Sequence, residues 1–270
     1  MSSGDFDLVV IGGGLAGMVA GTRAAQLGRR VAVLEKGTDP QYPCNTRWSG
    51  GIIHVGYVDP KENPAALRSA IALNTRGHTD PALAEVLISD TGKVIDWLRA
   101  LGGRFIRAGQ VAWQNWMMAP PRPLVGGLDW KGRGPDVMLR TLTDRLRAMG
   151  GTLHLGAKAE RLIVTDDRVT GVETTDGRTF EAASVLIADG GFQANLDWLR
   201  QRIAPKAEAV KQRGAATGMG DGIRMARDIG ADIGPLDRFY GHLLSRDAMH
   251  NDKVWPYPEI DALGTSGIVV

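Results

Sequence analysis

A glycine-rich turn near the N-terminus constrains this chain more than any other feature. Gly12, Gly14 and Gly17 form a GxGxxG pattern. The segments around it predict a buried strand, a helix and a second buried strand, at residues 6–11, 15–27 and 31–34. The first glycine suits a tight turn, the second lets the backbone approach a pyrophosphate, and the third lets the helix pack close to the strand. Strand–helix–strand order predicts a parallel pair with a right-handed crossover, and therefore a dinucleotide-binding unit.

A carboxylate at the end of the second strand limits the choice of dinucleotide. Glu35 lies 18 residues after Gly17, where a carboxylate accepts hydrogen bonds from a ribose diol and repels a 2′-phosphate. NADP is therefore disfavoured. Leu15 and Ala16 begin the helix whose free N–H groups attract a pyrophosphate. These residues leave NAD and FAD open, although the N-terminal position and the following Lys36 favour FAD. A glycine-rich turn without a ligand is the alternative, and the complete pattern argues against it.

Three further clusters follow the predicted dinucleotide unit. In the first, the glycine pair Gly50-Gly51 with the hydroxyls of Thr46 and Ser49 suits a backbone lying against a ring system, and a plain turn is equally compatible. The second, Asp189-Gly190-Gly191, follows a predicted buried strand at the carboxyl edge of a sheet, where open α/β folds bind ligands. In the third, Asp221 opens a helix and is equally explained as an N-cap.

The rest of the chain predicts alternating helices and short strands. We expect helices at residues 64–73, 81–101, 135–149, 195–202 and 222–229. We expect strands at residues 152–155, 159–164, 169–174, 178–181, 184–188 and 267–270. Residues 38–57 predict a loop, and Asp176-Gly177 predicts a hairpin turn.

The order of these motifs resembles a known family. The stretches DLVVIGGGLAGMVAGTRAAQLGRRVAVLEK, NTRWSGG, LIADGGFQAN and GAATGMGDGIRMARDIGA span residues 7 to 232. Together they resemble the fumarate reductase and succinate dehydrogenase flavoprotein superfamily, and most of all tricarballylate dehydrogenase and its relatives. The resemblance implies an α/β fold: a Rossmann-like FAD-binding domain with a parallel sheet and a small β-meander, followed by the beginning of an α+β capping domain.

The resemblance also implies the cofactor and its contacts. It favours FAD over NAD, places Thr46, Ser49, Gly50 and Gly51 along the flavin, and places Lys158 near the adenine through its backbone neighbours. The complete set of predicted cofactor-binding residues is Gly12, Gly14, Leu15, Ala16, Gly17, Glu35, Lys36, Thr46, Arg47, Ser49, Gly50, Gly51, Lys158, Ala159, Asp189, Gly190, Gly191 and Asp221. Succinate dehydrogenase subunits carry a flavin-linked histidine where this chain has Cys44, so we expect non-covalent FAD. For Cys44 itself we favour a partly buried thiol without a role.

The catalytic residues are less completely represented. His242 resembles the family's histidine that contacts the substrate carboxylate, although Leu243 replaces the usual proline. Arg47, Arg122 and Arg133 are candidate carboxylate binders, or surface arginines. The family's proton-donating arginine is expected beyond Val270. We therefore expect an FAD-binding domain at residues 1–238 without its returning C-terminal segment, an incomplete capping domain at residues 239–270, and a chain that is a fragment or is cut short.

Composition limits the classes of partner that we expect for this chain. Net charge is only +2, and no basic run interleaved with aromatic residues occurs, so we expect no nucleic acid partner. No apolar run approaches the roughly 20 residues that span a bilayer, and the single cysteine suits a reducing compartment. We expect a cytoplasmic protein without a metal site, whose electron carrier is a separate protein. The expected reaction is hydride transfer between FAD and a small (poly)carboxylate. The alternatives are a truncated FAD-binding protein without turnover, or a relative acting on a ketosteroid or a corrin precursor.

Overall fold

The computed structural model describes residues 5–122, 129–238, 241 and 246–250. Their contacts divide the chain into two compact units. The first unit comprises residues 1–48, 123–129 and 146–270, and the second comprises residues 49–122 and 130–145. The predicted boundary between residues 238 and 239 lies beside residues outside the described ranges, so the proposed capping domain stays a prediction.

A four-stranded parallel sheet forms the centre of the first unit. Its strands are β1 (Leu8–Ile11), β2 (Val31–Glu35), β5 (Thr152–Leu155) and β9 (Val185–Ile187), in the spatial order β5-β2-β1-β9. In register, Val10 pairs with Val33 of β2 and with Leu186 of β9. All four carboxyl ends therefore meet at one edge, as the motif order predicted.

Helix α1 (Leu15–Gln26) packs on one face of this sheet. It approaches so closely that a Cβ on Gly17 would overlap the Gly12 carbonyl oxygen, and a Cβ on Gly21 would lie 2.8 Å from a methyl group of Val33. Small residues at these positions are what allow the contact, because interiors pack without spare volume.

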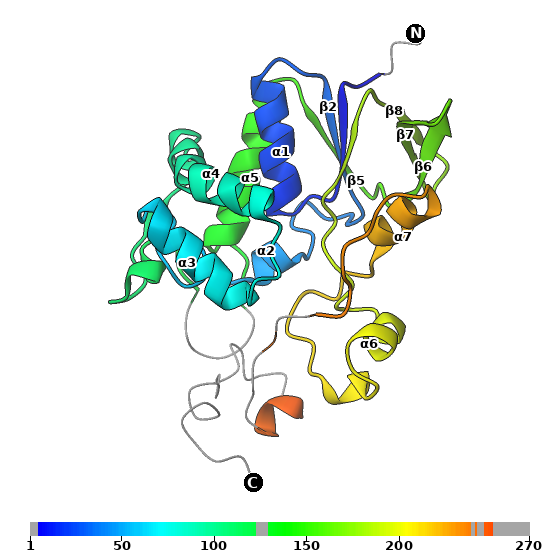
Figure 1. Ribbon diagram of the computed structural model, residues 1–270. Coiled ribbons are helices and arrows are strands. Elements are labelled where there is room, and N and C mark those ends of the chain that lie inside the picture. Colours follow the sequence, from blue (N-terminus) through cyan, green and yellow to red (C-terminus); the bar gives the residue numbers. More distant parts are fainter. Residues whose placement is uncertain (1–4, 123–128, 239–240, 242–245, 251–270) are drawn as a thin grey trace. The chain divides into compact units, whose positions relative to one another are not determined.

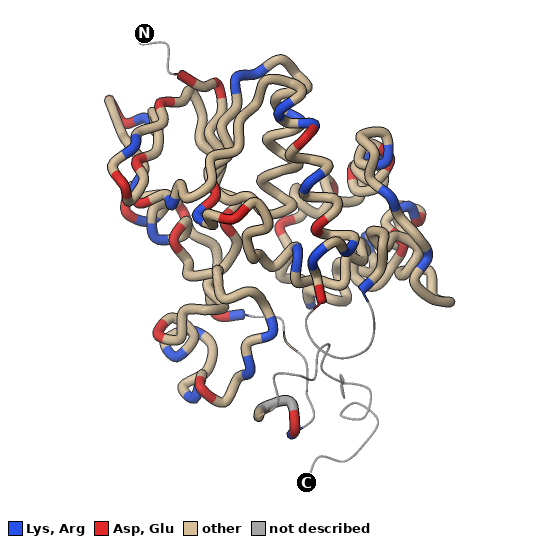
Figure 2. The backbone as a smooth tube through the Cα atoms, turned by 180° about the vertical axis from the view of Figure 1, so that it is seen from behind, with Lys and Arg blue, Asp and Glu red and all other residues tan. Residues whose placement is uncertain are grey.

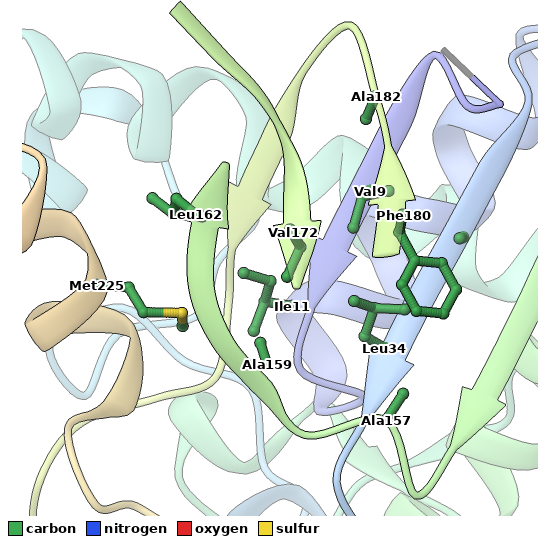
Figure 3. Packing of buried hydrophobic residues seen from close by; sticks show 11 residues of the cluster. Val9, Ile11, Leu34, Ala157, Ala159, Leu162, Val172, Phe180, Ala182 and Met225 are labelled. Atoms are coloured by element: carbon green, nitrogen blue, oxygen red, sulfur yellow. The ribbon is translucent and has the colours of Figure 1, made fainter. Parts of the chain in front are cut away.

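The opposite face packs on an antiparallel meander and a helix (Figure 1). The meander consists of β6 (Ala159–Thr165), β7 (Arg168–Thr174) and β8 (Thr179–Glu181), and the helix is α7 (Asp221–Asp228). Figure 3 shows the resulting core, in which Val9, Ile11 and Leu34 of the sheet face Val172 of the meander and Met225 of α7. Burying each such side chain contributes about 1.5–3 kcal/mol.

Among the described residues, the first unit contains shorter elements outside these layers. They are α2 (Asn45–Trp48), α6 (Leu196–Arg202) and the 3₁₀ turn at Ala207–Ala209, and a further 3₁₀ turn lies at Arg246–Met249. Helix α2 corrects the sequence prediction, which placed residues 38–57 in a continuous loop. A four-residue helix is too short to leave a periodic pattern of apolar residues.

The second unit is mainly helical. It contains α3 (Pro64–Thr75), α4 (Pro81–Ala100), the short strands β3 (Phe105–Ile106) and β4 (Met117–Met118), a 3₁₀ turn at Ala112–Gln114, and α5 (Gly134–Ala148) up to residue 145. Both α3 and α4 begin with proline after an N-cap, Asn63 or Asp80, whose side chain accepts a backbone N–H bond. Leu67 and Ile71 of α3 pack on Ile88 of α4.

Two further observations concern the charges along the chain and the hydropathy of its helices. Figure 2 shows Lys and Arg interspersed with Asp and Glu along the tube, without a long stretch of one sign. No helix in the described ranges is both long enough and apolar enough to cross a membrane.

Candidate cofactor site

The first unit contains a cavity of about 210 Å³ at the carboxyl edge of its parallel sheet. It brings together the predicted residues Gly12, Gly14, Leu15, Ala16, Glu35, Lys36, Thr46, Lys158, Ala159, Asp189, Gly190 and Asp221. These residues come from six separate segments of the chain. Pockets that enclose a drug-sized ligand measure roughly 300–1,000 Å³, so this cavity has room for one part of a dinucleotide.

The glycine loop fits a ligand that approaches its backbone. Gly12 has φ +107°, and a Cβ there would lie 2.6 Å from the Ala188 carbonyl oxygen, so the protein itself requires this glycine. Gly14 differs, because its φ of −70° suits any residue and a Cβ would meet only Thr46 Oγ1, at 3.6 Å. Gly14 is also the N-cap of α1 and carries no side chain to cap the helix. The loop therefore leaves open space in front of a helix N-terminus, where a phosphate binds well.

Glu35 holds the shape of this loop. It is buried, and its two carboxylate oxygens accept N–H bonds from Gly13 at 2.9 Å and Gly37 at 2.8 Å. A carboxylate has about four acceptor sites, so acceptor capacity remains for a ribose diol. Gly13 was not singled out from the sequence, although it stands inside the glycine triplet.

Tyr42 and Arg47 form a wall behind the loop. The hydroxyl of buried Tyr42 donates to the Gly13 carbonyl oxygen at 2.6 Å, and burial raises the pKa of this phenol. The guanidinium of Arg47 lies 4.1 Å from the Tyr42 ring centre and donates to the carbonyl oxygens of Tyr42 at 2.8 Å and Pro40 at 3.2 Å. Arg47 is 1 % exposed and does not line the cavity. The surface-arginine interpretation is therefore wrong for this residue, and no pattern in the sequence indicated the role of Tyr42.

Two side chains of helix α2 accept backbone N–H bonds from other segments near the cavity. Thr46 Oγ1 accepts the N–H of Leu15 at 2.9 Å, so the predicted flavin-side hydroxyl is bonded to the first turn of α1. Asn45 Oδ1 accepts the N–H of Ala215 at 2.9 Å. Asn45 and Thr217 also line the cavity. Asn45 begins the NTRWSGG stretch but was not among the predicted cofactor-binding residues, and its bonding partner lies 170 residues away.

Asp189, Lys36 and Asp221 form a charged cluster in the cavity lining. Asp189 Oδ2 accepts the N–H of Gly222 at 2.8 Å, and a Cβ on Gly222 would overlap the same carboxylate. The side chain of Lys36 lies 3.4 Å from Asp221 Oδ2 and donates to the Thr217 carbonyl oxygen. Burial raises the pKa of Asp189, the neighbouring Asp221 acts in the same direction, and the Gly222 N–H opposes both. Asp221 therefore stands at the start of α7, but its carboxylate is paired with Lys36.

Several predicted residues lie elsewhere. Ser49, Gly50 and Gly51 belong to the second unit and are not among the residues lining the cavity. Gly17 and Gly191 adjoin lining residues without lining the cavity themselves. The contacts of these five residues with FAD stay a prediction.

The remaining predicted residues are the candidate substrate binders and Cys44. His242 lies outside the described residues. Arg122 donates to the Ser49 carbonyl oxygen at 3.0 Å. Cys44 lines the cavity, and burial raises the pKa of its thiol. This thiol is more buried than the sequence predicted, and burial favours its unreactive protonated form.

Comparison with known proteins decides between the two dinucleotides. Residues 7–254 match the model of the FAD binding domain family. The chain belongs to this family. FAD, which the glycine loop alone left undecided, is thereby confirmed, and so is the resemblance to the fumarate reductase flavoproteins.

Individual relatives agree with this result. Vinyl phenol reductase of Lactiplantibacillus plantarum is 25 % identical over 84 % of this chain and 46 % of its own length. Urocanate reductase of Eggerthella lenta is 27 % identical over 85 % of this chain and 39 % of its own length. The open conformation of a flavocytochrome c3 fumarate reductase shares the fold, with a TM-score of 0.70 and 21 % identity over 85 % of this chain and 41 % of that one. The chain thus spans less than half the length of these relatives.

Proposed function

We propose that this FAD-binding chain belongs to an oxidoreductase that transfers a hydride between flavin and a small (poly)carboxylate, as fumarate reductase or tricarballylate dehydrogenase does. The observation that carries this proposal is the cavity in which the glycine loop, Glu35 and Asp189 meet at one edge of the sheet. Bound FAD supplies the hydride chemistry. The chain's residues hold and orient it.

Each part of the cavity has a proposed task. The N-terminus of α1 faces the pyrophosphate across the open space at Gly14, and Glu35 accepts from the adenosine ribose. Lys158 lies on the adenine side. Ser49 and the Gly50-Gly51 pair lie along the flavin ring. FAD is held without a covalent bond, because a buried thiol with a raised pKa, Cys44, occupies the place of the flavin-linking histidine.

The substrate class follows from chemistry that the relatives share. Vinyl phenol, urocanate and fumarate each contain a conjugated carbon–carbon double bond, and two of the three are carboxylates. A small carboxylate with such a bond, or its saturated product, is therefore our proposed substrate. His242 binds the substrate carboxylate. A separate carrier protein exchanges the electrons, and the cytoplasm is the proposed location.

The test begins with cofactor binding. Apoprotein that is mixed with FAD and then separated from unbound FAD by gel filtration should stay yellow, with a flavin band near roughly 450 nm, and acid precipitation should release all of the colour. Gly14→Asp should fold normally, since a Cβ has room there, but its carboxylate should repel the pyrophosphate and abolish binding. Gly234→Asp is the matched control, because a Cβ at Gly234 meets no atom within 4 Å and this residue does not line the cavity. Equal FAD binding by both variants would contradict the site.

Turnover is then tested anaerobically. Reduced flavin in the complex should be reoxidised by fumarate or urocanate faster than by buffer alone. Reoxidation by a ketosteroid instead would favour that relative's substrate class. A yellow protein whose reduced flavin no candidate reoxidises would favour an FAD-binding chain without turnover.

A further inference from the structure

Asp189 stands out among the residues that line the cavity. Its backbone touches the glycine loop, since a Cβ on Gly12 would lie 2.7 Å from its Cα, and its carboxylate is fixed against the N-terminus of α7 by the 2.8 Å bond from Gly222. The carboxylate lies so close to Gly222 that a Cβ there would overlap it. A carboxylate is therefore held beside the loop that receives a pyrophosphate.

The other titratable side chains that line the cavity come from several elements around Asp189. From α7 comes Asp221, which lies 3.4 Å from Lys36 at the end of β2. Glu35, also from β2, is turned toward Gly13 and Gly37. The remaining titratable groups lining the cavity are Lys158 and Cys44. The glycine loop contributes none.

These groups leave the cavity short of positive charge. Three carboxylates, those of Glu35, Asp189 and Asp221, face two ammonium groups, those of Lys36 and Lys158. One ammonium is already paired with Asp221. An incoming pyrophosphate brings further negative charge, and two like charges close together in a partly buried site disfavour each other.

We propose that Asp189 couples FAD binding to the uptake of one proton, so that the chain holds FAD with the Asp189 carboxyl group neutral. This inference rests on the proposed FAD site. The proton comes from the solvent and stays on the carboxyl group, and no other bond changes. Protonation removes one negative charge from the cavity wall and turns one carboxyl oxygen into a hydrogen-bond donor.

The direction of the effect follows from linkage. Burial, together with Asp221, already raises the pKa of free Asp189, and bound pyrophosphate raises it further. A group whose pKa is higher in the complex than in the free protein strengthens binding at low pH. FAD affinity should therefore be greatest below the pKa of free Asp189 and fall as pH rises through the pKa of the complex. Cys44 does not produce this pattern, because its raised pKa keeps it neutral over the same range.

The experiment measures FAD affinity by flavin fluorescence between about pH 5 and pH 8 at constant ionic strength. For the wild type, each unit by which FAD raises the Asp189 pKa should weaken binding about tenfold over the range. Calorimetry in two buffers of different ionisation enthalpy should show net proton uptake of up to one per FAD. Asp189→Asn should lose both effects, and near pH 8 it should bind about tenfold more tightly than the wild type.

Two further variants make the result specific. Asp221→Asn removes a neighbouring negative charge, so its affinity should begin to fall at lower pH than in the wild type. Asp232→Asn, an exposed carboxylate outside the cavity lining, should keep the wild-type profile. Circular dichroism checks that each variant folds.

The outcomes separate two failures. A flat wild-type profile, or an Asp189→Asn profile that keeps the wild-type slope, overturns the proton coupling alone. So does a folded Asp189→Asn protein that no longer binds FAD, since the charged carboxylate would then be a required ligand group. A wild-type chain that binds no FAD at any pH overturns the proposed function, and this inference with it.

Discussion

Polar side chains have different tasks at the cavity of the first unit and at the helix starts of the second unit. At the cavity of the first unit, side chains bond backbone groups that are far away in sequence: Glu35 to Gly13, and Asn45 to Ala215. In the second unit, Asn63 and Asp80 cap the helices that they immediately precede. Long-range polar contacts also occur in the second unit, as between Arg122 and Ser49, but those named in the first unit border the cavity. The local caps serve only their own helices.

The largest effect is expected when two glycines inside helices, one in each unit, are replaced by alanine. Gly17→Ala should lower the free energy of unfolding by about 3 kcal/mol, because its Cβ would overlap the Gly12 carbonyl oxygen, and FAD binding should be lost. Gly92→Ala in α4 should change stability by less than about 1 kcal/mol, since its Cβ would meet Lys61 Cγ at 3.3 Å and the Pro60 carbonyl oxygen at 3.4 Å, close to ordinary contact. Urea unfolding measures both. A stabilised Gly17→Ala protein would show that the close packing of α1 is unimportant.

A smaller effect is expected from one hydroxyl group. Tyr42→Phe removes the buried bond to Gly13 and should cost about 1–2 kcal/mol of stability and weaken FAD binding, because the glycine loop loses a support. Tyr57→Phe, at a half-exposed tyrosine of the second unit, should change stability by less than about 0.5 kcal/mol. Thermal unfolding and FAD titration test the pair. Equal FAD affinities in the wild type and Tyr42→Phe would show that the bond from Tyr42 to Gly13 does not support FAD binding.

The smallest effect should come from a helix cap. Asp80→Ala removes the acceptor for the N–H groups of Ala82 and Leu83 and should cost about 1 kcal/mol. Asp80→Asn should keep most of that stability, and neither change should alter FAD affinity. Amide exchange in the first turn of α4 reports the cap directly. A loss of FAD binding in Asp80→Ala would contradict the contrast between the units.

Local patterns predicted much of the fold. β5 has the predicted bounds of residues 152–155, and α5 starts and ends one residue before the predicted 135–149. Both are marked by apolar periodicity and by flanking glycine or proline, which are properties of neighbouring residues. The glycine loop and Glu35 were found for the same reason.

The remaining features depend on distant parts of the chain. Neither the burial of Arg47 nor the bond between Tyr42 and Gly13 leaves a periodic signal, because each arises when separated segments meet. The division into two units was likewise not predicted, since it depends on which segments contact each other. His242 and the predicted strand at residues 267–270 lie outside the described residues, so they stay predictions.

The position of Arg47 has a consequence for how quickly the cofactor is captured. Its guanidinium bonds the carbonyl oxygens of Pro40 and Tyr42, so the loop behind the cavity loses its conformational freedom when the chain folds. A ligand that enters a cavity backed by an already ordered loop does not have to restrict that loop, and preorganisation of this kind strengthens binding. Association then depends on encounter and orientation rather than on a slow ordering step.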